Sequence, residues 1–431
     1  MMIWPNPTYW KPHWLRLLAL ALSPACLFSH TVAVGQVVEV TASSAELPAT
    51  DAPPSPGSLV SQLAEDDTAI PAIEDGFDAP EMPGLPFGGA GLGTGLTASL
   101  GVTHGSYSTA PSMVGDFFGG SFVSKDGSSG LPNQSIPGEG GRPPTISLAG
   151  GDRRFKIAEN VSPIPRDRVF FNFNHFENAL TDFRGQAVSL GRYTGGFEKT
   201  FLDELASIEM RLPIADGLNS TQRLTGTDTE GVELSNLSVA LKAIMITGDW
   251  WAITGGTTLT LPIADDYVET VFDNESLRVR NQAVHLAPFV GWLIVDDGDW
   301  FAQGFVQTDF DLNGNEVVRN GDVELGRLQD QNLLFVDASV GRWLMRDASS
   351  HRWINGVAWM TELHYTTTIN DTDRVGGLTN PFSHMDILNL TAALHVESGL
   401  TSVRVGGAAP MRDDEESLYD AEVIVQLTRQ F

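Results

Sequence analysis

Cysteine is almost absent from this chain, whose single thiol is Cys26. That residue lies in an N-terminal leader, so the chain without its leader has no disulfide and no cysteine-ligated metal. Long apolar runs are also missing. After the leader, no unbroken apolar stretch reaches the roughly 18 residues of a transmembrane helix. This absence leaves a membrane β-barrel open, because membrane strands are only half apolar.

Basic residues are scarce. The sequence has 26 lysines and arginines against 54 aspartates and glutamates, which gives a net charge of −28. A nucleic-acid backbone would be repelled, and the sequence has no basic stripe, so we expect no nucleic-acid partner. The excess of acidic residues is typical of solvated loops and tails.

The leader, residues 1–35, has the order of a secretory signal peptide. Lys11 and Arg16 supply positive charge near an apolar stretch, and small residues precede the expected cleavage before Gln36. A lipoprotein cut before Cys26 is the weaker alternative, because a serine stands where leucine is usual. The sequence therefore predicts that the protein is exported.

Residues 36–165 are rich in glycine and proline and show no periodic pattern. Such a composition buries too little apolar surface to offset the entropy lost on ordering. A flexible periplasmic extension is the favoured interpretation. The alternative is a plug or a docking segment, for which Asp116, Phe117 and Phe118 form the aromatic candidate.

Apolar and polar residues alternate from Arg168 onward. Between residues 206 and 214, for example, Ile208 and Met210 share one face while Glu209 and Arg211 share the other. This period of two predicts half-buried strands. About twelve are expected, at residues 168–176, 192–201, 205–214, 233–246, 250–263, 281–295, 300–312, 332–346, 352–369, 384–397, 400–409 and 419–431.

The connections between these strands alternate in length. Those after residues 201, 246, 295, 346 and 397 are short, and those after 176, 214, 263, 312, 369 and 409 are long. Outer-membrane barrels combine short periplasmic turns with longer outer loops. We therefore expect residues 166–431 to form an all-β, antiparallel transmembrane barrel in the outer membrane.

The last strand carries the most specific local signal. Val423, Val425, Leu427 and Phe431 alternate with polar residues, which suits one lipid-facing and one lumen-facing side. The pattern resembles the C-terminal signal of outer-membrane proteins, which ends in an aromatic residue and is read by their assembly machinery. Arg429 departs from that pattern, although near an interface its head group can reach water.

A longer resemblance begins at Phe155. The letters FKIAEN from Phe155, SP from Ser162 and DRVFFNFN from Asp167 resemble the opening segment of a family of exported, porin-like barrels. GFEKTFLD from Gly196 and IEMRLP from Ile208 are similar to the next hairpin of that family. The resemblance covers about a quarter of the barrel region. It implies a fold and a membrane, and no substrate or catalytic residue.

Polar residues on the inward faces are candidates for lining a lumen. They are Glu209, Arg211, Lys242, Asp337, Glu362, His364, Glu397, Arg404, Glu422 and Gln426. Charges of both signs that face each other across a lumen create a transverse field, which sorts solutes by dipole and charge.

Motifs for metal binding or catalysis are missing. None of the nine histidines has ligand spacing, so we expect no metal and no cofactor. His364 and Glu362 are expected to form a lumen-facing polar pair. Acidic residues near 371–373 and 413–416 are weaker candidates for calcium, and solvated loops are the favoured interpretation. Without a GxSxG elbow we expect no enzyme. A barrel hydrolase, the alternative, requires a Ser/His or Asp/His cluster at one rim, and His285 cannot be paired from sequence.

Five tryptophans lie at or near the short turns. They are Trp250, Trp251, Trp300, Trp343 and Trp353. Aromatic rings favour membrane interfaces, so they predict a periplasmic girdle, with an ordinary hydrophobic core as the alternative.

Together these observations predict a porin-like barrel for passive passage of small solutes or for membrane anchoring. The expected partners are outer-membrane lipid and the assembly machinery, and the sequence is compatible with an oligomer. The alternatives are a barrel enzyme of lipase or protease type and a soluble exported β-protein used for surface attachment.

Overall fold

The computed structural model describes most of the chain from Ala110 to Phe431. The described residues are 110–117, 119–125, 146–152, 154–181, 187–218, 220–223, 231–272, 274–296, 299–321, 323–347, 352–370, 375, 378–379, 385–412 and 417–431. The signal peptide, residues 36–109, Phe118 and the acidic positions at 371–373 and 413–416 lie outside them.

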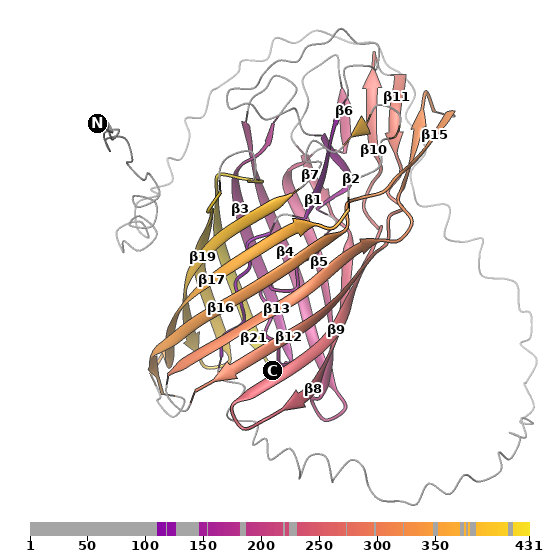
Figure 1. Cartoon of the computed structure of the whole chain (residues 1–431). Coiled ribbons are helices and arrows are strands. Elements are labelled where there is room, and N and C mark those ends of the chain that lie inside the picture. The colour runs from indigo at the N-terminus through magenta and orange to yellow at the C-terminus, as the bar shows by residue number, and fades with distance from the viewer. Residues whose placement is uncertain are drawn as a thin grey trace, which may run out of the picture. The chain divides into compact units, whose positions relative to one another are not determined.

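Twelve antiparallel strands form one closed barrel (Figure 1). In order around the wall they are β3 (Arg168–Thr181), β4 (Ala187–Phe201), β5 (Ala206–Leu218), β8 (Leu237–Thr247), β9 (Trp251–Leu261), β12 (His285–Val295), β13 (Trp300–Asp311), β16 (Leu333–Arg346), β17 (Gly356–Thr368), β19 (Asp386–Ser398), β20 (Thr401–Pro410) and β21 (Ala421–Gln430). The last strand pairs with the first, with Val425 opposite Phe173. The expected all-β barrel of about twelve strands is confirmed.

Side chains alternate between the interior and the outer surface along each strand. On β16, Phe335, Asp337 and Ser339 are buried, whereas Val336 and Val340 are exposed. Large apolar side chains are exposed on every wall strand except β9; they include Phe171, Phe197, Leu241, Val290, Val306, Leu363, Val405, Val423 and Leu427. A soluble protein rarely exposes so continuous an apolar surface, and a lipid-facing barrel requires it.

The two ends of the barrel differ. At the short-turn end, β4 and β5 are joined by residues 202–205, and β19 and β20 by residues 399–400. At the long-loop end, the connections carry further strands, which are β6 (Thr221–Arg223), β7 (Gly231–Leu234), β10 (Tyr267–Val271), β11 (Asn274–Val279), β14 (Asn315–Arg319), β15 (Val323–Leu328) and β18 (Leu378–Thr379). β6, β10, β11, β14 and β15 form a five-stranded sheet there.

Two more strands complete the described secondary structure. β1 (Gly120–Lys125) pairs with β2 (Ile146–Asp152) and with β18, at the long-loop end of the barrel (Figure 1). No helix in the described part of the chain is long and apolar enough to cross a membrane.

Two expectations from sequence need correction. The connection after residue 176 is short rather than long, because β3 and β4 extend to Thr181 and Ala187 and pair to their tips. Trp343 does not join a girdle: it is buried inside the barrel and packs against Phe301. Ile424 lies on the inward face of β21, as the phase of the strand predicts, and this apolar residue packs in a cluster with Val114 inside the barrel.

Candidate functional site

Two stretches of chain outside the wall run through the barrel interior. The ascending segment, residues 110–117, is entirely buried, and so is most of the descending segment, residues 154–167. The carbonyl of Ala110 accepts a hydrogen bond from Arg166 at the short-turn end, and that of Phe117 accepts one from Arg192 on β4. The chain therefore rises through the lumen to β1, and returns from β2 through the lumen to β3.

The two inner segments pair with each other. The amide of Met113 donates to the carbonyl of Val161 at 2.9 Å, and that of Asn160 donates to the carbonyl of Val114 at 3.4 Å. Gly115 lies against Glu159 with a φ of +87°, and a Cβ on Gly115 would stand 2.7 Å from the Glu159 Cα. Only glycine fits there without strain.

Polar side chains from most of the wall bind the inner segments. Their partners come from β3, β4, β5, β8, β13, β16, β17, β19, β20 and β21. Many bonds reach main-chain atoms: Gln307 both accepts from the Ile157 amide at 2.6 Å and donates to the Phe155 carbonyl at 2.8 Å. Phe289 and Phe305 complete the enclosure on β12 and β13 by packing with Phe155 and Ile157.

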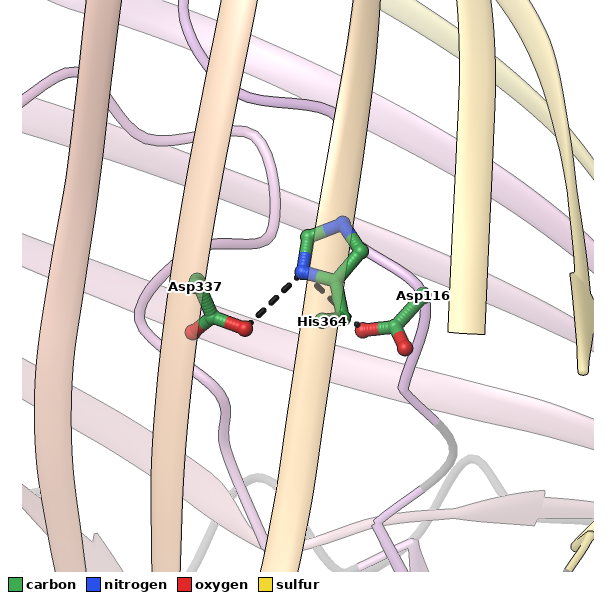
Figure 2. A group of neighbouring side chains, drawn as sticks. All are labelled: Asp116, Asp337 and His364. Carbon is green, nitrogen blue, oxygen red and sulfur yellow. Dashed lines mark hydrogen bonds and ion pairs between the residues drawn. The ribbon is translucent and has the colours of Figure 1, made fainter. Parts of the chain in front are cut away.

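One charged cluster joins both inner segments to β16 and β17, and Figure 2 shows three of its members, Asp116, Asp337 and His364. Nζ of Lys156 lies 2.7 Å from Oδ1 of Asp116 and 2.8 Å from Oδ1 of Asp337. His364 Nδ1 contacts the same Asp337 oxygen at 2.9 Å, and its Nε2 lies 3.1 Å from Oε2 of Glu362. Glu362 in turn accepts from the amides of residues 114 and 115.

This cluster has the composition of a metal site, because Asp116, Asp337 and His364 offer three ligand atoms within 4.8 Å of one another. The Lys156 ammonium group, however, contacts the two aspartate oxygens that an ion would bind. An internal cation thus supplies the positive charge that buried carboxylates require.

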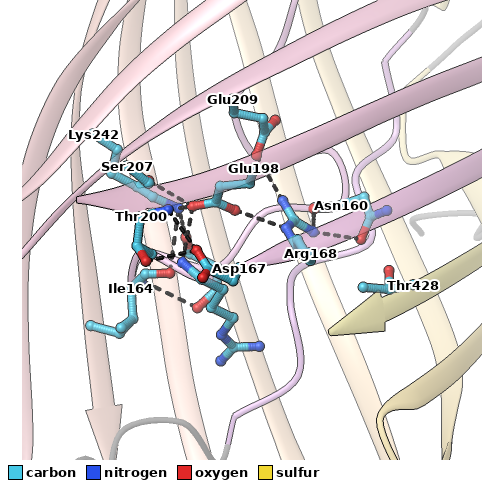
Figure 3. Close-up of polar contacts among 12 residues, drawn as sticks. Asn160, Ile164, Asp167, Arg168, Glu198, Thr200, Ser207, Glu209, Lys242 and Thr428 are labelled. Carbon is cyan, nitrogen blue, oxygen red and sulfur yellow. Dashed lines mark hydrogen bonds and ion pairs between the residues drawn. The ribbon is translucent and has the colours of Figure 1, made fainter. Parts of the chain in front are cut away.

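A second cluster connects the first strands of the barrel (Figure 3). Arg168 bridges Glu198 and Glu209 at 2.8 Å each, and Lys242 lies 2.9 Å from the other Glu198 oxygen. Lys242 also donates to the carbonyl of Ser162 at 2.7 Å, so the descending segment is bound to this cluster. All four charged side chains are buried.

Asp167 secures the descending segment where it meets the wall at the short-turn end. Its carboxylate accepts from Lys199 at 2.5 Å and from the amide and hydroxyl of Thr200 at 2.6 Å each. Partial burial alone raises the pKa of this carboxyl, but the hydrogen bonds from Lys199 and Thr200 outweigh it and hold the pKa below its ordinary value. The Phe431 ring lies 5.3 Å from the same lysine.

The ten lumen candidates can now be placed. Glu209, Arg211, Lys242, Asp337, Glu362, His364, Arg404, Glu422 and Gln426 are buried inside the barrel, and Glu397 is half-buried. Asp337, Glu362 and His364 come together in one cluster, and Glu209, Arg211 and Lys242 in the other. Arg404 and Gln426 donate to the carbonyls of Ser112 and Val114. Glu422 accepts from Asn174, and Glu397 contacts His395.

Sequence reasoning missed the charged partners that complete these clusters. They are Lys156, Glu159, Arg168, Arg192 and Glu198, whereas Asp116 was named only as part of the alternative plug segment. Arg168 and Glu198 lie at inward-facing positions of β3 and β4, so the alternation of inward and outward residues along these strands could have identified them. Lys156 and Glu159 lie in the FKIAEN stretch, which has no period and gives no direction for its side chains.

Known proteins give a likeness of fold only. The β domain of the Bordetella autotransporter BrkA is 14% identical, with a TM-score of 0.38, over 62% of this chain and 99% of that one. An outer membrane channel from Pseudomonas putida F1 is 9% identical, with a TM-score of 0.44, over 63% and 97%. The translocator domain of NalP from Neisseria meningitidis is 12% identical, with a TM-score of 0.37, over 62% and 87%.

No family model and no curated protein sequence matches the chain. The solved structures that the chain resembles include a porin and a channel as well as autotransporter domains, all with TM-scores below 0.5. In this chain, two segments that precede the first barrel strand occupy the lumen.

Proposed function

We propose that this protein is an outer-membrane channel for small polar solutes, closed by its own inner segments acting as a plug. The observation that supports this proposal is the charged lining of the lumen. Charged side chains of both signs line the lumen and are fully enclosed. Buried ion pairs are a weak source of stability, and apolar residues of similar size often stabilise a core better. A barrel that served only as an anchor would gain little from such an interior.

The contacts between plug and wall suit a plug that moves. Wall side chains such as Arg404, Gln303 and Gln426 bind backbone carbonyls of the ascending segment. Water can replace such hydrogen bonds at a net cost of about 0.5–1.5 kcal/mol for each glutamine and about 1.5–3 kcal/mol for the charged Arg404, because both partners remain solvated. When the inner segments leave, the lining becomes a hydrated lumen whose charges sort solutes.

Membrane anchoring is the alternative within the same fold. In that case the lumen stays filled and the barrel only holds residues 36–109 at the membrane. The assembly machinery is a proposed partner in both cases, because β21 has an outward apolar face and the aromatic residue Phe431 directly follows it.

A barrel hydrolase is the second candidate function, favoured by one observation. His285 Nδ1 lies 2.9 Å from Oδ1 of Asp309 at the long-loop end, as an Asp/His pair at a rim requires. Both side chains are only 2% exposed, however, and a catalytic pair must reach its substrate. The channel is therefore the better account.

Solute entry into proteoliposomes tests the proposal. We expect slow swelling with small sugars for the wild type and faster swelling for Lys156→Met, which releases both inner segments from β16. Lys199→Met is the matched control, because Lys199 is exposed and its partner Asp167 keeps the two hydrogen bonds from Thr200 that hold the descending segment at the wall. Equal and negligible swelling of all three would favour the anchor.

A further inference from the structure

A buried histidine and three aspartates gather at the long-loop end, apart from both charged clusters. His285 is the first residue of β12, Asp309 and Asp311 lie at the end of β13, and Asp330 lies between β15 and β16. His285 pairs in register with Asp311. His285, Asp311 and Asp330 offer three ligand atoms within 4.8 Å of one another.

The imidazole of His285 is oriented for coordination. Its Nδ1 lies 2.9 Å from Oδ1 of Asp309, so a neutral ring donates its proton there and keeps the lone pair on Nε2. A carboxylate behind a histidine fixes the tautomer in this way in many metal sites. Nε2 is buried, has no hydrogen-bond partner, and lies 3.4 Å from Oδ2 of Asp330.

The carboxylate of Asp311 is held rigidly beside it. Oδ1 accepts from the amides of Asn313 at 3.1 Å and Gly314 at 2.7 Å, and Oδ2 accepts from the amide of Asp330 at 2.8 Å. Each carboxylate oxygen has a second lone pair, so these bonds orient the group and leave it able to bind a cation.

The charges of this cluster also favour a bound cation. Three carboxylates are buried here, and Nη2 of Arg154 lies 3.9 Å from Oδ2 of Asp330, which is long for an ion pair. That guanidinium group donates to the carbonyl of Gln331 at 2.8 Å, so it is directed elsewhere. A lone pair on Nε2 that faces the Asp330 oxygen is repulsive, so either a proton on Nε2 or a bound cation must lie between the two atoms.

We propose that His285, Asp311 and Asp330 bind one divalent cation of the zinc class, with Asp309 as the positioning residue. One imidazole nitrogen and two carboxylate oxygens suit a borderline ion such as Zn²⁺. Ligand bonds of about 2.0–2.2 Å require only a small closure of the three groups. Their separation along the chain explains why no ligand spacing was visible in the sequence. The proposal is independent of the channel function.

The contrast with the Lys156 cluster supports this choice. There, an ammonium group contacts the carboxylate oxygens of Asp116 and Asp337 directly at 2.7 and 2.8 Å. In the His285 cluster the described contact with a basic side chain is longer, because Nη2 of Arg154 lies 3.9 Å from Oδ2 of Asp330.

Metal binding to the full-length protein in detergent is the test. After treatment with a chelator and dialysis, titration with Zn²⁺ in a calorimeter should give one ion per chain with micromolar or tighter affinity. His285→Ala should abolish this binding, and Asp309→Asn should weaken it about 10–100-fold, because the ligands stay but lose their orientation. His175→Ala, which removes an exposed histidine from β3, should bind like the wild type.

Co²⁺ provides a readout that needs no variant. Visible d–d absorption on adding one equivalent to the stripped wild type is expected, and Zn²⁺ should displace it. The proposal is overturned if the wild type takes up no stoichiometric Zn²⁺ or Co²⁺. It is equally overturned if His285→Ala, folded by circular dichroism, binds as tightly as the wild type; the site then holds a proton instead.

Discussion

Nζ of Lys156 lies 2.8 Å from Oδ1 of Asp337, and both side chains are fully buried. This ion pair joins the descending segment to the barrel wall, and its link to Asp116 includes the ascending segment. A single ammonium group therefore connects three parts of the chain that are distant in sequence.

Lys156→Met should destabilise the closed barrel. Removing one partner leaves Asp116 and Asp337 buried without their cation, which costs about 3–5 kcal/mol. We expect a lower denaturant midpoint and a lower temperature for the shift in gel mobility. Lys199→Met should change either measurement by less than about 0.5 kcal/mol, because that side chain is exposed. A Lys156→Met protein as stable as the wild type would mean that the pair does not hold the plug.

Val425→Asp should reduce the amount of assembled protein. Val425 faces outward near the middle of β21, where a lipid-facing charge costs about 2–4 kcal/mol. Val425→Thr keeps the size without the charge and serves as the control. The folded fraction in outer-membrane preparations is the measurement. Equal assembly of the two variants would contradict a lipid-facing position for Val425.

Labelling of single cysteines on intact cells tests which end of the barrel is outside. Phe272→Cys and Asn320→Cys lie in turns of the sheet at the long-loop end, and both positions are exposed. Leu202→Cys lies in the β4–β5 turn at the short-turn end and is also exposed. A membrane-impermeant maleimide should label the first two and not the third. The reverse pattern would invert the topology.

The sequence predicted the barrel wall well because lipid on one side and a polar lumen on the other impose a strict period of two. Val423, Val425 and Leu427 are outward and Gln426 is inward, as their phase indicates. The exception, Ile424, is informative: its apolar side chain faces Val114 of the ascending segment.

The inner segments could not be placed in this way. Residues 110–117 and 154–167 form hydrogen bonds and ion pairs with side chains 100 or more positions away, such as Glu362 and Gln307. Such contacts depend on the closed wall, and they leave no periodic pattern of polar and apolar residues in the sequence of the inner segments. The strands of the five-stranded sheet at the long-loop end were missed for a related reason. β10 and β14, for example, are only five residues long, which is too short for a periodic pattern to be recognised.

Gly115 offers the sharpest test of the occupied lumen. A side chain there meets the Glu159 backbone at 2.7 Å and must also adopt a φ of +87°, so Gly115→Ala should separate the two inner segments. Gly321 has a φ of +84° but nothing within 4 Å of an added Cβ, so Gly321→Ala carries similar backbone strain, about 1–3 kcal/mol, without the clash.

The most direct measurement is single-channel conductance of the wild type, Gly115→Ala and Gly321→Ala in planar lipid bilayers. The account predicts that the wild type and Gly321→Ala stay mostly closed, and that Gly115→Ala opens at least ten times as often. A wild type that conducts steadily, with the same current as Gly115→Ala, would contradict a lumen closed by residues 110–117 and 154–167.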